Sequence, residues 1–541
     1  MHALATSSAK NRAKAKKPER VASLANEGAT PRSSAPAPRD ANEEDAPVGK
    51  WGVGDAGEAE IDPLAPEMAS PEAAETETRR ESIVDDAFHG FDRFIARSTG
   101  PRLGSIAKET WVRAEPSRHA RRIGYLRAGA IVQRGGEPEG FEGCKGGWYK
   151  IEPRGYVCID RTATLDLDAP QMRASRTQPR MDGLPYDYAI ARLPGPVFYT
   201  RVPTPAEQNR EESDLGFHMR EAKAMERDSS FVAPPHGDPL PGFLLGGDGH
   251  DRPEIPGLGD GPPRGSELTA GQAKPRAGFA LLETYDVGGR PFGLTTDLDL
   301  IPLDRTRIIV QSKFHGIELG SEATLPVAFV MKHHTTHFVA DASGQMRPGA
   351  SLDYREAVPI TGKEKGGGAW LEAKDGSWLR VEDVRRVDAP HRMPAWATGS
   401  HKWIDVSILH QSLVAYEGTT PKYVTLVSTG ADGLGDPKTT HSTIQGIFLI
   451  HTKHVSVTMD NDDANDAFDL RDVPFVQYFN EGYALHAAYW HDDFGTPRSH
   501  GCVNLAPIDA AWLFGFTTPD VPDGWHAALT LHKGTLVYTH P

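Results

Sequence analysis

The chain has 541 residues, which is enough for about two to four domains of ordinary size. Its formal net charge is −15, from 59 Lys and Arg against 74 Asp and Glu, and this balance does not favour binding to phosphate backbones. The sequence contains no stretch that is long and apolar enough to span a bilayer. We therefore expect no nucleic-acid partner and no transmembrane segment.

Residues 1–100 are predicted to be a disordered leader, because they are rich in Ala, Pro, Glu and Ser and contain few aromatic residues. Six basic residues stand in the first twenty positions: Lys10, Arg12, Lys14, Lys16, Lys17 and Arg20. No apolar run of the length found in secretory signals follows them, so no signal peptide is visible. We interpret the basic residues as a solvated tail.

Residues 105–168 have the pattern of a small β module. Short strands are predicted around Trp111, at residues 128–132, and in a hairpin formed by residues 146–151 and 155–158. This pattern resembles the bacterial SH3-like β-barrel domain. Cys144 and Cys158 flank the predicted hairpin, where they would form a disulfide in an oxidising compartment or remain two reduced core thiols.

Residues 184–390 are predicted to form a second β-rich region with an insert. Strand patterns occur at residues 279–285 and 376–381, and the latter repeats the Gly-x-Trp hairpin of the first module. Residues 203–276 are rich in Pro, Gly, Asp and Glu and show little periodicity, so we expect a flexible insert there. The region fits a second SH3-like or related barrel.

Two segments have the residue types of metal sites without a complete ligand set. His333, His334 and His337 have a spacing that zinc can use, but no Cys or acidic residue completes a tetrahedral set nearby. The acidic run 460–469 resembles a calcium loop but lacks the required glycine and terminal glutamate. We expect no metal and no cofactor.

The most specific chemical pattern lies in residues 400–541. His486 is followed by Ser499-His500-Gly501-Cys502-Val503-Asn504, the only place where one of the three cysteines stands in such a setting. A cysteine attacks a carbonyl as its thiolate, so it needs a base, and His486 and His500 are the candidates. Gly501 leaves room for backbone N–H groups to approach a developing oxyanion.

These residues resemble the motif of the L,D-transpeptidase catalytic domain of the YkuD type. The resemblance implies that Cys502 is the nucleophile, His486 the general base and His500 the histidine beside the nucleophile. It implies oxyanion-hole positions at Gly501 and Cys502, and positioning roles for Ser499 and Asn504. The alternating strand patterns at residues 403–430, which include Ser428-Thr429-Gly430, support the resemblance. The segment Thr443-Ile444-Gln445-Gly446-Ile447-Phe448 also supports it, although it lacks the proline that is usual in the family.

The resemblance implies a mainly β protein whose C-terminal domain is a β-sandwich with short helices. The implied function is a peptidoglycan L,D-transpeptidase of the cell envelope, which cross-links stem peptides through a cysteine thioester without a cofactor and is inhibited by carbapenems. Two alternatives remain open: an L,D-carboxypeptidase, in which water resolves the thioester, and a noncatalytic wall-binding scaffold.

Overall fold

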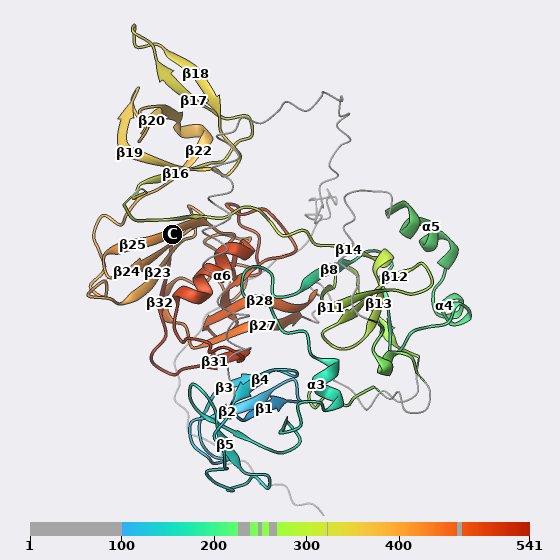
Figure 1. Cartoon of the computed structure of the whole chain (residues 1–541). Helices are drawn as coiled ribbons and strands as arrows, with labels where there is room; N and C mark the ends of the chain where they lie inside the picture. Colours follow the sequence, from blue (N-terminus) through green and yellow to red (C-terminus); the bar gives the residue numbers. More distant parts are fainter. Residues whose placement is uncertain (1–99, 226–238, 247–251, 259–267, 322, 462–467) are drawn as a thin grey trace, which may run out of the picture. The chain divides into compact units, whose positions relative to one another are not determined.

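The computed structural model describes residues 100–225, 239–246, 252–258, 268–321, 323–461 and 468–541 (Figure 1). The predicted leader and the centre of the acidic run 460–469 lie outside these residues. Within them the protein is mainly β, as the sequence predicted, with few helices. None of the described helices has the length and apolar character needed to cross a bilayer.

The N-terminal module is built from short strands. They are β1 (Arg102–Ser105), β2 (Thr110–Arg113), β3 (Arg122–Leu126), β4 (Ile131–Gln133), β5 (Trp148–Lys150), β6 (Tyr156–Cys158) and β7 (Ala163–Thr164). β1 pairs with β4 and β7, while β2 pairs with β3 and β6. Cys144 and Cys158 form a disulfide. The SH3-like character of this module stays a prediction.

The middle region begins with a short helix and continues as antiparallel strands. Its elements are α3 (Pro170–Ala174), β8 (Asp187–Ala191), β9 (Val197–Tyr199), α4 (Pro205–Glu211), α5 (Leu215–Met225), η1 (Gly242–Leu244), β10 (Thr269–Gln272), β11 (Gly278–Asp286), β12 (Pro291–Thr295), β13 (Leu300–Pro302), η2 (Leu303–Arg305) and β14 (Thr306–Ile308). β11 lies between β8 and β12, and apolar side chains of β8, β11 and β13 share one core.

The prediction of a flexible insert is wrong for residues 205–225, which form α4 and α5. Thr204 starts α4 with a capping box, in which its hydroxyl and the Glu207 carboxylate each bind a backbone N–H. Glu212 is buried and accepts two hydrogen bonds from the equally buried Arg290, at 2.7 and 2.8 Å. The helices are therefore held by a charge pair whose members lie 78 residues apart in the chain.

The next region, which precedes the C-terminal domain in the chain, forms one sheet of strands. Its elements are β16 (Val327–Val330), β17 (Thr336–Ala340), β18 (Met346–Ser351), β19 (Ala357–Lys365), β20 (Trp370–Ala373), β21 (Trp378–Arg380), η3 (Val381–Asp383) and β22 (Val384–Val387). The strands run in the order β18-β17-β21-β20-β19-β16-β22. Before them, β15 (Ile317–Glu318) pairs with a strand of the C-terminal domain.

The C-terminal domain contains two sheets and one helix. Its elements are β23 (Lys402–Ser407), β24 (Ser412–Glu417), β25 (Thr420–Leu426), β26 (Gly446–Leu449), β27 (Thr452–Asn461), β28 (Phe468–Asn480), β29 (Tyr483–Ala487), β30 (Val503–Leu505), α6 (Pro507–Phe516), β31 (Ala527–Leu529) and β32 (Leu536–His540). One sheet has the order β15-β25-β24-β23-β32-β26, and the other contains β27 to β31. Ile404, Val406, Phe475, Leu485 and Leu505 belong to the core between them.

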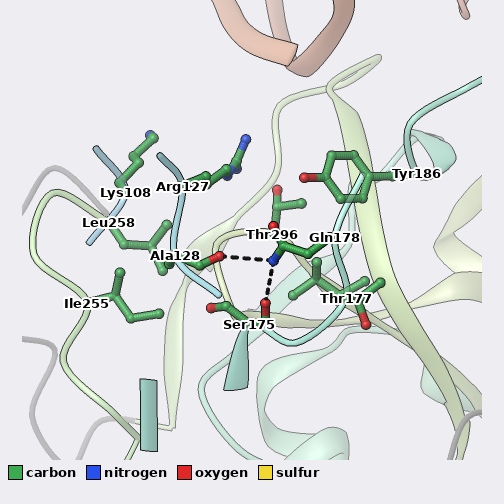
Figure 2. A pocket seen from close by; sticks show the side chains of 11 residues that line it. Lys108, Arg127, Ala128, Ser175, Thr177, Gln178, Tyr186, Ile255, Leu258 and Thr296 are labelled. Carbon is green, nitrogen blue, oxygen red and sulfur yellow. Dashed lines mark hydrogen bonds between the residues drawn. The ribbon is translucent and has the colours of Figure 1, made fainter. Parts of the chain in front are cut away.

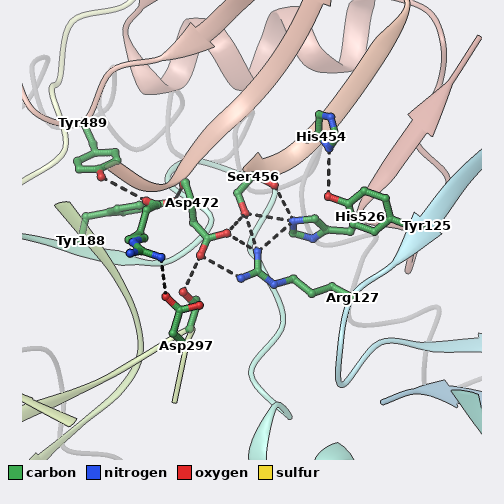
Figure 3. Close-up of polar contacts among 11 residues, drawn as sticks. Tyr125, Arg127, Tyr188, Asp297, His454, Ser456, Asp472, Tyr489 and His526 are labelled. Carbon is green, nitrogen blue, oxygen red and sulfur yellow. Dashed lines mark hydrogen bonds and ion pairs between the residues drawn. The ribbon is translucent and has the colours of Figure 1, made fainter. Parts of the chain in front are cut away.

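The β27–β28 hairpin joins the C-terminal domain to both upstream parts of the described chain. β31, which pairs with β27, also pairs with β3 of the N-terminal module, and β28 pairs with β11 of the middle region. Arg127, just after β3, forms a buried ion pair with Asp472 of β28 (Figure 3). Both the N-terminal module and the middle region therefore hold the hairpin in place.

The Arg127–Asp472 pair lies in a network of neutral polar groups. Ser456 and Thr296 donate hydrogen bonds to Asp472 at 2.8 and 2.6 Å, and His526 contacts Ser456 and Arg127 (Figure 3). A cavity of about 20 Å³ adjoins Arg127 and is lined in part by Gln178 and Tyr186 (Figure 2). It has room for about one water molecule, so this junction is close-packed.

Candidate active site

Strand pairing brings His486 to the cysteine motif. β29 and β30 are parallel neighbours, with His486 opposite Asn504 and Leu485 opposite Val503. Paired residues on neighbouring strands have side chains on the same face, and Cys502 precedes Asn504 by two positions. The pairing therefore directs the base candidate and the thiol to the same side of the sheet.

The Cys502 thiol is partly buried in an apolar setting. Its Sγ donates a hydrogen bond to the Gly482 carbonyl oxygen at 3.6 Å. It packs against a cluster of Val473, Val476 and Ala484, on which Tyr478 also packs. Burial raises the pKa of the thiol to about 11, although the Ala484 N–H group lowers it in part. The pKa of the thiol is therefore raised and not lowered, because desolvation is the largest influence on it.

His486 is buried and held in one orientation. The side chain is 3% exposed, and Nδ1 donates a hydrogen bond to the Ala487 carbonyl oxygen at 3.0 Å. Burial lowers the pKa of His486 to about 4, so the ring is neutral near pH 7. With the proton on Nδ1, Nε2 is the ring nitrogen that can accept another proton. This arrangement suits a general base.

The turn before Cys502 is fixed by hydroxyl groups. Ser499 Oγ accepts a hydrogen bond from Gly501 N at 3.0 Å and donates one to the Cys502 carbonyl oxygen. Thr443 Oγ1 donates to the Gly501 carbonyl oxygen at 2.7 Å. Gly501 has a φ of +129°, and a Cβ at this position would lie 2.8 Å from the Tyr483 ring. Only glycine fits this turn without strain.

The Gly501 N–H group is engaged within the turn. Its hydrogen bond to Ser499 means that it does not point freely at a substrate oxygen in this structure. The sequence placed oxyanion donors at both Gly501 and Cys502. Of these two donors, the one at Gly501 is already engaged with Ser499 Oγ.

Asn504 lies beside a histidine that the sequence interpretation did not include. Its side chain is buried, and its Nδ2 lies 2.9 Å from His491 Nε2. The Asn504 backbone also exchanges two hydrogen bonds with Ser428, at 2.8 and 2.9 Å. Asn504 therefore connects the cysteine motif to the predicted Ser428-Thr429-Gly430 segment and to His491.

His500 has other neighbours. Its side chain is exposed, and its ring packs against the rings of His441 at 4.8 Å and Phe468 at 5.1 Å between centroids. The ring in contact with His486 is instead that of Trp490, at 5.8 Å. The structure thus associates His486, and not His500, with the interior side of the site.

Four residues next to the candidate site were not assigned a role by the sequence interpretation: Thr443, Tyr478, Trp490 and His491. Burial and the nearby Cys502 raise the pKa of Tyr478 to about 12. A signal existed for two of them, since Trp490 and His491 directly continue the segment that contains His486. Thr443 lies in the segment compared with the family loop, but nothing in its spacing revealed a contact with Gly501.

The candidate metal ligands are not gathered around a common point. Among the described residues, no three His, Cys, Asp or Glu side chains form a group that could hold a metal ion. The His333 ring stacks on Tyr354 at 4.3 Å, while His337 faces Asp375, with 3.9 Å between Nδ1 and the carboxylate.

Comparison with known proteins gives a family match over the C-terminal domain. The sequence profile of the L,D-transpeptidase catalytic domain matches residues 401–538. A curated relative is YciB of Bacillus subtilis (strain 168), whose name proposes an L,D-transpeptidase. It is 25% identical over 140 residues, which cover 21% of this chain and 60% of YciB. The chain thus spans less than two thirds of the length of this relative.

Solved L,D-transpeptidases are also similar to part of the chain. A mutant of the Enterococcus faecium enzyme is 20% identical, covering 26% of this chain and 50% of that one, with a TM-score of 0.20. The Stackebrandtia nassauensis enzyme is 25% identical, covering 27% and 57%, with a TM-score of 0.19. L,D-transpeptidase 3 of Mycobacterium tuberculosis is 19% identical, covering 34% and 79%, with a TM-score of 0.21.

The profile match coincides with the strands and the motif described above, from β23 to β32. Residues 401–538 of this chain therefore belong to the L,D-transpeptidase catalytic domain family.

Proposed function

We propose that this protein is a peptidoglycan L,D-transpeptidase in which Cys502 forms a thioester with a stem peptide. The observation that supports this most is the parallel pairing of β29 and β30, which brings His486 and the Cys502 turn together inside the family domain. The site residues carry distinct roles: Cys502 is the nucleophile, His486 the base, and Ser499, Gly501 and Asn504 hold the turn.

The first half of the reaction transfers the acyl group to sulfur. Cys502 attacks the carbonyl carbon before the terminal D-amino acid, and its proton passes to His486 Nε2. The C–N bond then breaks, the leaving amine takes the proton from His486, and the acyl group stays on sulfur. Because the resting thiol and imidazole are both neutral, the proton transfer accompanies the attack instead of preceding it.

The second half transfers the acyl group to an acceptor amine. The amine attacks the thioester and gives its proton to His486, and the C–S bond breaks as the thiolate recovers that proton. During both halves the Cys502 N–H group faces the oxyanion. Gly501 N–H contributes a second donor if it leaves Ser499 Oγ when substrate binds.

His500 has a separate role in this scheme. Its exposed ring beside His441 and Phe468 borders the turn from the outside. We assign it to the mouth of the site, where it contacts bound peptide, and not to proton transfer with the thiol. The substrate places the enzyme in the cell envelope, and the Cys144–Cys158 disulfide fits an oxidising compartment.

Intact-mass spectrometry tests the proposal. The protein and a Cys502→Ala variant are incubated with a carbapenem and, separately, with a disaccharide-tetrapeptide. We expect a carbapenem adduct that depends on Cys502, together with a cross-linked dimer of the substrate. A thiolate opens the lactam by the same attack that forms the thioester.

Two other outcomes identify the alternatives. An adduct accompanied only by the shortened tripeptide would identify an L,D-carboxypeptidase. The absence of an adduct with either compound would leave the noncatalytic scaffold as the explanation. His486→Gln serves as a second control, since it removes the base and keeps the thiol.

A further inference from the structure

His491 lies in the loop between β29 and the cysteine motif, and the proposed chemistry gives it no role. Contacts from other segments hold this loop. Arg355 binds the Asp492 carboxylate through two nitrogens, at 2.8 and 2.9 Å. Ser428 Oγ donates a hydrogen bond to the Asp493 carbonyl oxygen at 3.0 Å. The backbone that follows His491 is therefore fixed from two sides.

This fixed backbone determines which nitrogen of the His491 ring carries a proton. The Asp493 N–H group donates a hydrogen bond to His491 Nδ1 at 3.2 Å, so Nδ1 is an acceptor and carries no hydrogen. Burial and the nearby Arg498 lower the pKa of His491 to about 3, so the ring is neutral near pH 7. A neutral imidazole has one N–H group, which must then be at Nε2. His491 Nε2 is therefore a hydrogen-bond donor.

The donor at His491 Nε2 decides the orientation of the Asn504 carboxamide. The two groups meet at 2.9 Å. A carboxamide NH2 group in this position would set two N–H donors against each other, whereas a carboxamide oxygen accepts the bond. The carboxamide of Asn504 therefore turns its oxygen to His491, and its NH2 group takes the opposite position.

The Asn504 NH2 group then has no partner in the resting protein. The end of the carboxamide that points away from His491 is buried and makes no hydrogen bond to any of the described residues. A buried donor without a partner costs free energy, so a substrate that supplies an acceptor gains from this group. Asn504 pairs with His486 across β29 and β30, which places both side chains on one face of the sheet. The unpaired donor thus lies on the face of the catalytic base.

We propose that His491 is a positioning residue, whose Nε2–H group holds the Asn504 carboxamide so that its NH2 group donates to the carbonyl oxygen of the peptide bound at Cys502. This inference rests on the proposed function, because it assigns a role within the same site. A side-chain donor is useful there, since the Gly501 N–H group is already engaged in the turn. His491 acts through Asn504 and transfers no proton.

Nitrogen-15 NMR of the full-length protein, labelled at histidine, tests the first step without catalysis. We expect His491 to show a protonated Nε2 and an unprotonated Nδ1 near pH 7. Its signals are assigned from their loss in His491→Gln. A proton on Nδ1 would overturn the proposal, because Nε2 would then accept a hydrogen bond and the Asn504 carboxamide would have the opposite orientation.

The rate at which a carbapenem acylates Cys502, followed by intact mass, tests the second step, with the lactam carbonyl in place of the peptide carbonyl. His491→Leu removes the donor and should slow acylation about fivefold, which corresponds to one neutral hydrogen bond. His491→Gln returns an N–H donor and should restore most of the rate. His532→Leu changes an exposed histidine outside the site and should leave the rate unchanged.

A double-variant cycle separates positioning from a merely structural role. In the Asn504→Ala background there is no carboxamide to orient, so the addition of His491→Leu should slow acylation no further. A further loss in that background, or a parent rate in His491→Leu alone, would overturn the proposal. Thermal unfolding of each variant confirms that the fold is retained. Failure of the parent protein to react with the carbapenem would contradict the proposed function, whereas the NMR result would still decide the orientation of Asn504.

Discussion

At the scale of single residues, the Cys502 and His486 side chains form a neutral pair in the resting protein. Burial raises the pKa of the thiol to about 11 and lowers the pKa of the imidazole to about 4. Among the described residues, no cation contributes to the pKa shift of this thiol. The free thiol is therefore a weak nucleophile toward small reagents, and its reactivity depends on a substrate that completes the site.

The raised pKa predicts the pH dependence of thiol alkylation. Below the pKa the thiolate fraction grows about tenfold per pH unit, so the iodoacetamide rate of Cys502 should keep rising from pH 7 to about pH 10. The measurement is the alkylated mass at timed intervals, with Cys502→Ala as the blank. A rate that levels off below pH 9 would show that a positive charge stabilises the thiolate after all.

A second residue-scale prediction concerns Thr443. Its hydroxyl accepts a hydrogen bond from Gly430 N at 2.9 Å and donates one to the Gly501 carbonyl oxygen at 2.7 Å. Thr443→Val keeps the shape but leaves two buried polar groups unpaired, which costs about 1–3 kcal/mol each. We expect a lower Tm and carbapenem acylation slowed about tenfold. Thr443→Ser keeps the hydroxyl and should restore most of the rate; equal loss in both variants would argue against this role.

At the scale of elements, the β27–β28 hairpin carries residues of the apolar cluster on which Cys502 packs. Asp472 lies in this hairpin with a φ of +49°, a conformation that Asp and Asn tolerate better than most residues. Burial opposes ionisation of Asp472, but the Arg127 guanidinium and the hydrogen bond from Thr296 together outweigh it and lower the pKa of the carboxyl below its usual range. The hairpin is thus anchored through a charge supplied by the N-terminal module.

Removing that charge should loosen the hairpin. Arg127→Met leaves the buried Asp472 carboxylate unpaired, and we expect a loss of about 3–5 kcal/mol in the free energy of unfolding. Urea unfolding gives this value, and hydrogen exchange should show the loss in residues 468–480. The double variant Arg127→Met with Asp472→Asn removes the unpaired charge and should recover part of the stability. If the double variant is no more stable than Arg127→Met, Arg127 contributes to stability through packing alone.

At the scale of the whole molecule, buried neutral histidines make stability depend on pH. Burial and Arg127 lower the pKa of His526 to about 3, and burial lowers that of His486 to about 4. Both values lie below the unfolded value of about 6.5. The stability from each neutral ring is therefore complete above pH 6.5 and is lost as pH falls, because the unfolded chain then binds more protons.

This predicts acid destabilisation that starts well above the pKa of ordinary carboxylates. Between about pH 6 and pH 4, each of the two histidines should contribute a slope of about 1.4 kcal/mol per pH unit. Urea unfolding at several pH values measures the slope. His486→Gln removes one titrating group, so its slope should be smaller by that amount; an unchanged slope would show that His486 is protonated in the folded protein.

The sequence predicted those elements whose formation depends on local residue patterns. Alternating patterns located β2, β11, β21 and the strands from β23 to β25, and motif spacing selected His486 and Cys502 as the site candidates. It failed for α4 and α5, because a buried pair with Arg290 holds Glu212 there and no local pattern reveals such a partner. The direction of the Cys502 pKa shift and the neighbours of His500 also depend on packing between distant segments, which spacing does not encode.

The pairing of β3 with β31 has a consequence for the order of assembly. Gly124 and Tyr125 find their backbone partners only at Ala528 and Ala527, some 400 residues later in the chain. During synthesis the N-terminal module therefore emerges with one edge unpaired until almost the whole chain has been made. Such distant pairing slows folding, and an uncovered strand edge invites contacts with other chains in the interval. A chain whose translation stalls before residue 527 should therefore bind chaperones more strongly than the complete chain.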